Sequence, residues 1–216
     1  MIFVNFKTYQ QGTGAKASKL AEICEKVSKK TGETVILVAQ ASDIFRLSRA
    51  VSLPVWAQDV DEINYGSHTG WILPEAIKDS GAKGAILNHS EKRRSPEAVG
   101  KIVRRLKDLN LKSLLCCQSI DEGQKLVKFQ PDFLAYEPAE LIGSCEVSVA
   151  SAKPETIRNF VLKFSRLPVV VGAGIHSPED VKLSLRLGAK GILVATDVVL
   201  ARNPQKELAE LAQAFG

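Results

Sequence analysis

The first 39 residues run from Ile2-Phe-Val-Asn-Phe6 through a polar-apolar segment at 15–30 to Thr34-Val-Ile-Leu-Val-Ala39. Both apolar runs have the length and the branched or aromatic residues of buried strands, and the segment between them repeats its apolar residues with helical spacing. A helix between two strands carries the chain back to the edge where the first strand began, so the strands pair in parallel. This stretch therefore predicts an α/β fold built on a parallel sheet.

Six further apolar runs continue the alternation, at 54–58, 85–88, 113–117, 132–136, 168–172 and 191–194. Segments of helical spacing that begin near a cap residue or a proline separate several of them, at 95–109, 154–164 and 178–187. An open sheet that binds a dinucleotide would carry a G-x-G-x-x-G turn after its first strand, which is absent, whereas eight strand–helix units close a barrel. We therefore expect one domain over residues 1–216, an α/β (β/α)₈ TIM barrel with short helices and loops.

The composition argues against several classes of protein. There are 29 Lys and Arg against 24 Asp and Glu, a formal charge of +5, and the short basic runs at 92–94 and 104–105 have no interleaved aromatic residues, so we expect no nucleic-acid partner. The four cysteines show no C-x-x-C spacing, which argues against a zinc site and a disulfide framework. No apolar stretch reaches the length of a membrane span and no basic leader opens the chain, so we expect a cytoplasmic protein without a membrane partner.

Polar or small residues stand where several predicted strands end. They are Asn5 and Lys7, Gln58, Asn88 and His89, Glu137, 172–174, and Ala195 with Thr196. Parallel strands of a barrel point the same way, so these ends meet on its C-terminal face, where barrel enzymes build their sites from the strand-to-helix loops. We therefore expect an amine, an imidazole, a carboxylate and a backbone cradle for phosphate around one cavity.

Eight short motifs lie at or near these strand ends. They are Val4-Asn-Phe-Lys-Thr-Tyr9, Trp56-Ala-Gln58, His68-Thr-Gly70, Asn88-His-Ser-Glu91, Ala135-Tyr-Glu-Pro138, Leu141-Ile-Gly143, Gly172-Ala-Gly-Ile175 and Gly191-Ile-Leu-Val-Ala195. In this order they resemble the motifs of the short, archaeal-type triosephosphate isomerases, and eight in sequence form a specific pattern. The resemblance implies an isomerase of glycolysis and gluconeogenesis that interconverts dihydroxyacetone phosphate and D-glyceraldehyde 3-phosphate through an enediolate, without a metal or an organic cofactor.

The resemblance assigns roles to five candidate catalytic residues. It implies that Glu137 is the base that moves a proton between neighbouring carbons, and that a neutral His89 polarises the carbonyl and shuttles protons between the substrate oxygens. Lys7 would supply positive charge where negative charge develops, and Asn5 would hold Lys7 and the substrate oxygen in place. Glu91 would orient Lys7 or a nearby proton carrier. For single residues of these types, a helix cap, an ion pair or a structural histidine is the alternative.

Four residues occupy the family's phosphate positions, namely Gly143, Gly174, Ala195 and Thr196. Backbone N–H groups would bind the phosphate there, and glycine permits the close approach. The segment 138–152 would be a lid that closes over the substrate and excludes water.

The chain departs from the family pattern at three positions. Cys145 stands in the predicted lid where glycine is common, and Lys92 stands where arginine is common. Asp197 stands beside the presumed phosphate site, where relatives usually have glycine. A carboxylate about 4 Å from a phosphate charge costs from about 1 to about 4 kcal/mol, depending on the effective dielectric constant. We therefore expect Asp197 to turn outward and to cap the final helical turn.

Loop 59–71 resembles the family's interdigitating segment, in which Thr69 reaches toward the active site of a neighbouring subunit. We therefore expect a homo-oligomer, either a dimer or a tetramer, with a triose phosphate as the small-molecule partner. Two other functions remain open. Lys7 could form a Schiff base in another phosphate-binding barrel, such as an aldolase or a synthase, and a degenerate barrel could serve only for binding or assembly.

Overall fold

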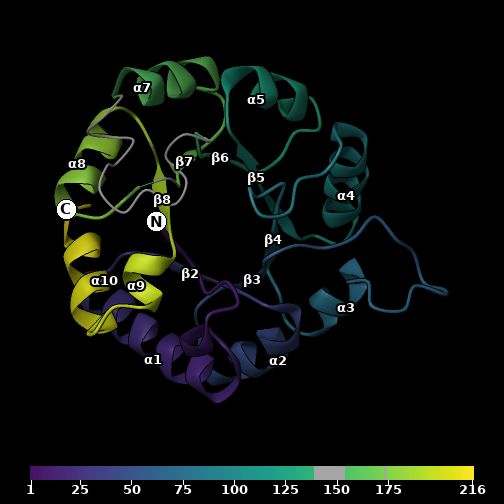
Figure 1. The fold of residues 1–216 in the computed structure, drawn as a ribbon, viewed down its shortest axis with the longest axis horizontal. Coiled ribbons are helices and arrows are strands. Elements are labelled where there is room, and N and C mark those ends of the chain that lie inside the picture. The colour runs from purple at the N-terminus through teal and green to yellow at the C-terminus, as the bar shows by residue number, and fades with distance from the viewer. Residues whose placement is uncertain (139–153, 173) are drawn as a thin grey trace.

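Parallel strands close into a barrel in the computed structural model, which describes residues 1–138, 154–172 and 174–216 (Figure 1). The strands are β1 (Ile2–Asn5), β2 (Val35–Ala39), β3 (Val55–Ala57), β4 (Gly84–Leu87), β5 (Lys112–Cys117), β6 (Phe133–Tyr136), β7 (Val169–Val171) and β8 (Gly191–Val194). Each strand pairs in parallel with the next, and β1 pairs with β8 to close the ring. The predicted TIM barrel is confirmed, and every predicted strand lies within one residue of the observed one at each end.

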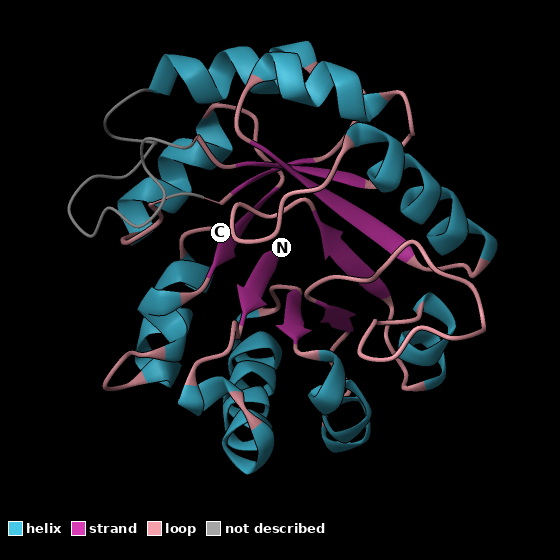
Figure 2. Ribbon diagram, turned by 45° about the vertical axis from the view of Figure 1, so that its right-hand side comes forward, coloured by secondary structure: helices cyan, strands magenta, loops and turns pink. Residues whose placement is uncertain are grey.

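Helices surround the barrel on its outer face (Figure 2). They are η1 (Gln10–Gly12), α1 (Gly14–Thr31), α2 (Ala41–Ala50), α3 (Pro74–Asp79), α4 (Pro96–Asp108), α5 (Ile120–Val127), α7 (Pro154–Lys163), α8 (Pro178–Arg186), α9 (Thr196–Val199) and α10 (Pro204–Gln213). Ser95 and Ser177 cap α4 and α8, and each is followed by a proline at the first helical position, which favours a helix start. Among the described residues, none of the helices has both the length and the apolar character needed to cross a bilayer.

Alternate residues of each strand point to opposite sides of the barrel wall. Phe3, Trp56 and Phe133 point inward and meet edge to face, with ring centroids 5.3 to 6.0 Å apart. Ile2 and Val4 belong to the larger cluster that packs the strands against the helices. Because the interior is filled with side chains, a ligand has access to the barrel at its ends, and the polar strand ends lie at the C-terminal one.

Candidate active site

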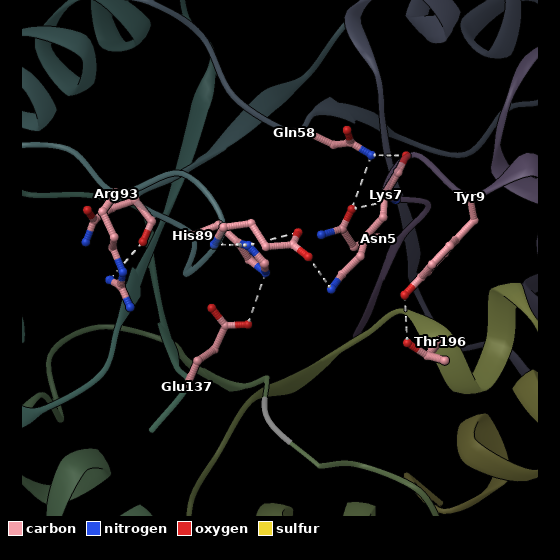
Figure 3. Close-up of polar contacts among 10 residues, drawn as sticks. Asn5, Lys7, Tyr9, Gln58, His89, Arg93, Glu137 and Thr196 are labelled. Carbon is pink, nitrogen blue, oxygen red and sulfur yellow. Dashed lines mark hydrogen bonds and ion pairs between the residues drawn. The ribbon is translucent and has the colours of Figure 1, made fainter. Parts of the chain in front are cut away.

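Side chains that follow five different strands meet at the C-terminal end of the barrel (Figure 3). They include Asn5 at the end of β1, Gln58 after β3, His89 after β4, Glu137 after β6 and Thr196 after β8. The barrel thus brings together groups that lie far apart in the sequence, because all eight strands point in the same direction.

Lys7 is held at both its backbone and its side chain. Its N–H donates to Oδ1 of Asn5 at 3.0 Å, and its carbonyl accepts from Nε2 of Gln58 at 2.8 Å. Its ammonium donates to Oε1 of Glu91 at 3.1 Å. These contacts support a left-handed backbone at Lys7, with φ of 46°, which is unusual for a residue other than glycine. The amine is therefore fixed at the mouth of the barrel.

The imidazole of His89 lies between two carboxylates. Nε2 lies 3.6 Å from Oε1 of Glu137, and Nδ1 lies 3.5 Å from Oε2 of Glu91. The backbone N–H of Glu91 donates to Nδ1 at 3.2 Å, and a ring nitrogen that accepts a hydrogen bond carries no proton. With Nδ1 as the acceptor, the ring proton lies on Nε2, the nitrogen that faces Glu137.

A single turn follows His89, and no helix begins there. The N–H of Lys92 donates to the carbonyl of His89 at 2.9 Å, and α4 begins only at Pro96. The contact at Nδ1 therefore comes from the turn itself.

The carboxylate of Glu137 is buried, and one of its oxygens has no partner in the described part of the chain. The residue is 4% exposed, and Oε2 has no hydrogen-bond partner among the described residues. Such a group costs about 1–3 kcal/mol or more, so it marks a position kept for a purpose other than stability. A Cβ atom at Gly172 would lie 2.8 Å from Cγ of Glu137 and 2.9 Å from its Oε1. Glycine at 172 therefore leaves the room that the Glu137 side chain occupies.

The proposed phosphate residues that the structure describes lie after β7 and β8. Gly174 has a left-handed backbone, with φ of 61°, and Ala195 precedes α9, whose first residue is Thr196. The hydroxyl of Tyr9 lies 3.1 Å from Oγ1 of Thr196, so the loop after β1 contacts the loop after β8 (Figure 3). Two residues named above lie outside the described residues, Gly143 and Cys145, as does the predicted lid from 139 to 152.

Comparison with known proteins identifies this arrangement. Residues 1–214 match the family model described as triosephosphate isomerase. The chain belongs to the triosephosphate isomerase family. It is 42% identical over 215 residues to a triosephosphate isomerase of Methanothermus fervidus, covering 98% of this chain and 96% of that protein.

Two other archaeal triosephosphate isomerases are similar to the same extent. That of Methanocaldococcus jannaschii is 40% identical over 215 residues, with 98% of each chain covered. That of Saccharolobus solfataricus is 42% identical over 209 residues, with 95% of this chain and 92% of that protein covered. The resemblance inferred from the eight motifs is confirmed.

A thiol lies next to the carboxylate of this triosephosphate isomerase site. Cys116 is fully buried in β5, and burial, followed by the charge of Glu137 and a hydrogen bond to it, raises the pKa of Cys116 well above its ordinary value. The thiol stays protonated at neutral pH, so Cys116 is a neutral neighbour of Glu137 and not a nucleophile.

A buried network that was not predicted fixes the loop that carries His89. Asn88 is 2% exposed and has a left-handed backbone, with φ of 60°; its Nδ2 donates to Oε1 of Glu122 at 2.8 Å. Arg93 donates to the same oxygen at 3.0 Å and to the carbonyl of Asn88 at 2.9 Å. The sequence signal was an asparagine at a strand end directly before the histidine, since asparagine tolerates this backbone conformation.

The prediction that Asp197 caps the final helical turn is wrong. The cap residue of α9 is Ala195, without a side-chain cap bond, and Asp197 lies inside the first turn. Its Oδ1 lies 2.9 Å from Nδ1 of His176, in the loop after β7. The prediction considered only residues next to Asp197 in sequence, whereas its partner comes from the neighbouring loop. Lys92, another departure from the triosephosphate isomerase pattern, contacts Oδ2 of Asp59 at 2.8 Å.

A cavity of about 680 Å³ opens beside the site. Its lining includes residues of the site and extends toward 40–42 and Ile72; the site residues are Asn5, Lys7, Tyr9, Gln58, His89 and Glu91. Glu137 and Thr196 are not part of its lining, so the cavity lies on the Lys7 side of the triosephosphate isomerase site. Within the described ranges, no three His, Cys, Asp or Glu side chains are grouped so that they could hold a metal ion.

Proposed function

We propose that this chain interconverts dihydroxyacetone phosphate and D-glyceraldehyde 3-phosphate, with Glu137 as the base, His89 as the electrophile and Lys7 as a fixed positive charge. The observation that carries the proposal is the 3.6 Å approach of Oε1 of Glu137 to Nε2 of His89, at the end of a barrel whose family performs this reaction. Lys7 joins the same group through Glu91, which contacts both Lys7 and His89.

Each group has one part in the proton transfer. Glu137 takes a proton from the carbon beside the carbonyl, and the electron pair of that C–H bond moves onto the carbonyl oxygen to give the enediolate. His89, protonated at Nε2, donates to this oxygen, and the Lys7 ammonium stabilises its negative charge. Glu137 then returns the proton to the neighbouring carbon, while His89 exchanges a proton between the two oxygens, so every group ends in its starting state.

The environment of Oε2 of Glu137 supports the role of base. A carboxylate oxygen that is buried, and that no described donor satisfies, is left to accept a proton from the substrate. Burial of the site also strengthens the attraction of the developing charge to Lys7, whose side chain is only 23% exposed. Asn5 would hold Lys7 at its backbone N–H, and Glu91 would hold its ammonium.

The phosphate would lie on the loops after β6, β7 and β8, against Gly143, Gly174, Ala195 and Thr196. The left-handed backbone of Gly174 supports this, because such a turn exposes backbone N–H groups to an anion. The residues from 138 to 152 would then close over the substrate and hold the enediolate away from water.

The alternative mechanism, a Schiff base on Lys7, depends on whether the amine of Lys7 is available to react. A Schiff base requires a free amine, whereas the ammonium of Lys7 donates to the carboxylate of Glu91 at 3.1 Å. Treatment with borohydride in the presence of glyceraldehyde 3-phosphate separates the two mechanisms. We expect an active protein without a reduced adduct at Lys7; a stoichiometric adduct would support the aldolase-type alternative.

Turnover of glyceraldehyde 3-phosphate by the purified chain, in an assay coupled to a dehydrogenase that consumes dihydroxyacetone phosphate, is the primary test. We expect measurable kcat and saturation at low substrate concentration. A folded wild-type chain that shows no turnover would contradict the proposal and favour the degenerate barrel instead.

The chain would act as a homo-oligomer joined through loop 59–71. The neck of this loop is closed by the N–H of Ile72, which donates to Oδ2 of Asp61 at 2.7 Å, and the loop extends away from the barrel (Figure 1). Tyr65 is 72% exposed and Trp71 is 55% exposed, and an assembly joined through this loop would cover both aromatic side chains. The cavity beside Lys7 would receive the same loop from a second copy, and Thr69 of that loop would reach toward the active site.

Sedimentation equilibrium tests the association. We expect a dimer or a larger assembly for the wild type and dissociation in Trp71→Asp; a monomeric wild type that is fully active would contradict this role of the loop. Residues 1–216 would function as one domain, and the place of the reaction in glycolysis supports a cytoplasmic location.

A further inference from the structure

Two loops of the proposed phosphate site are joined by a contact between His176 and Asp197. Nδ1 of the imidazole lies 2.9 Å from Oδ1 of the carboxylate, and the two side chains are 29% and 32% exposed. Asp197 directly follows Thr196, and His176 lies two residues after Gly174. The contact therefore lies between the two described segments that are proposed to hold the phosphate.

His176 is fixed from its own side of the contact. Its backbone N–H donates to Oδ2 of Asp180 at 3.1 Å. Ser177 shares this carboxylate through its own N–H and hydroxyl, and Ser177 and Asp180 form the capping box of α8. The imidazole thus extends from a helix start whose geometry is set by reciprocal hydrogen bonds.

The surroundings of Asp197 on its other side are acidic. Burial, followed by the negative charges of Glu210 and Asp197, raises the pKa of Glu207 in α10, with Lys206 acting in the opposite direction. The α10 side therefore places the carboxylate of Glu207 near Asp197, whereas the α8 side contributes the imidazole.

We infer that His176 is a positioning residue for phosphate binding, which holds the Asp197 carboxylate toward α8 and offsets its charge. An imidazole with a proton on Nδ1 donates to the carboxylate whether the ring is neutral or cationic, so it fixes the direction of Asp197 in both states. The cationic ring also cancels the negative charge that would otherwise repel the phosphate dianion. The inference rests on the proposed function, since it assumes that the phosphate lies on these loops.

This role explains how a carboxylate is tolerated next to Thr196. Without His176, the side chain of Asp197 could turn toward the phosphate or remain charged beside it. Either change opposes the binding of an anion in the ground state and in the transition state equally, so it raises KM and leaves kcat nearly unchanged.

The test uses His176→Ala, Asp197→Asn and the double variant. For each, kcat and KM for glyceraldehyde 3-phosphate are measured, together with the inhibition constants of inorganic phosphate and 2-phosphoglycolate. We expect His176→Ala to raise KM and both inhibition constants about fivefold, as for one uncompensated charge near a partly exposed anion, with kcat within about twofold. Asp197→Asn should bind phosphate as tightly as the wild type or more tightly, and the double variant should match Asp197→Asn.

Rescue by Asp197→Asn is the decisive readout, because a general loss of structure at His176 would not be reversed by removing a charge elsewhere. His176→Gln, which keeps a hydrogen-bond donor but carries no charge, replaces His176→Ala if that variant is unstable, and the same rescue is expected. Unchanged inhibition constants in the His176 variants, or a double variant as weak as the single one, would overturn the inference. A wild type without turnover would instead contradict the proposed function.

Discussion

The Nε2 atom of His89 and the Oε1 atom of Glu137 lie 3.6 Å apart, one after β4 and the other after β6. The separation exceeds the range of a hydrogen bond, so the imidazole does not satisfy the carboxylate. Both groups therefore stay available to a substrate, His89 as a donor and Glu137 as an acceptor.

Shortening the base tests this arrangement. Glu137→Asp withdraws the carboxylate by one methylene group, and a misplacement of about 1 Å at a reacting group lowers the rate about 10²-fold. We expect kcat to fall by about that factor with KM within about twofold, measured by steady-state kinetics in the coupled assay. Glu155→Asp, on the exposed first turn of α7, is the matched control and should keep full activity. Equal kcat for Glu137→Asp and the wild type would remove Glu137 from the mechanism.

Gly172→Ala should displace the carboxylate of Glu137 and leave its chemical identity unchanged. The new Cβ atom would lie 2.8 Å from Cγ of Glu137, so the carboxylate must move or the strand end must shift. We expect kcat to fall at least about tenfold while the far-ultraviolet circular dichroism spectrum is unchanged. Gly123→Ala is the control, because its Cβ atom would crowd the ring of Phe164, at a position away from the site. It should lower the thermal stability and leave kcat intact, and a similar loss of kcat in both variants would contradict the specific role of Gly172.

The contact between Tyr9 and Thr196 predicts a coupled effect on binding. Tyr9→Phe removes the hydroxyl that lies 3.1 Å from Oγ1 of Thr196, while the ring stays packed against the core. We expect KM to rise about threefold to tenfold with little change in kcat, as for one lost hydrogen bond. Thr196→Val should have a similar effect, and the double variant should be no weaker than either single one. Additive losses in this double-mutant cycle would show that the two hydroxyls act independently.

Acid stability should depend on Asp61. Burial raises the pKa of Asp61, but hydrogen bonds from Ile72 and Arg94 and the charges of Lys92 and Arg94 outweigh it and hold the pKa below its ordinary value of 3.8. Because the folded pKa is the lower one, the stabilisation is complete above pH 3.8 and is lost as the pH falls below that value through the folded pKa.

Urea unfolding of Asp61→Asn from about pH 6 to about pH 3 measures this loss. We expect the variant to be about 1–3 kcal/mol less stable than the wild type near neutral pH, with the difference shrinking in acid. Asp79→Asn, at an exposed position at the end of α3, should show no such trend. A difference that stays constant down to pH 3 would contradict the role of the Asp61 charge.

The sequence predicted the fold because buried parallel strands are continuous apolar runs. β2, Val35–Ala39, is buried at every position, and its bounds could be read directly from the residue types. Glu137 and His89 were found because each directly follows such a run, and the barrel then brings strand ends together.

Contacts between loops could not be predicted in this way. The pairing of His176 with Asp197 depends on the neighbouring position of β7 and β8, and that of Asn88 with Glu122 on how α5 packs beside the loop after β4. Residue types and spacing do not tell how far apart such side chains lie in the fold. Asp197 was therefore predicted to cap its own helix, whereas its partner lies in the adjacent loop.

Lys7 and Asn88 both adopt left-handed backbones, and both stand at the edge of the site. Each such residue costs roughly 1–2 kcal/mol relative to a right-handed one, a penalty that glycine avoids. A library screened only for heat resistance should therefore enrich glycine at positions 7 and 88. Those survivors would lack the amine or the buried amide, so directed evolution of this barrel needs selection for turnover in every round.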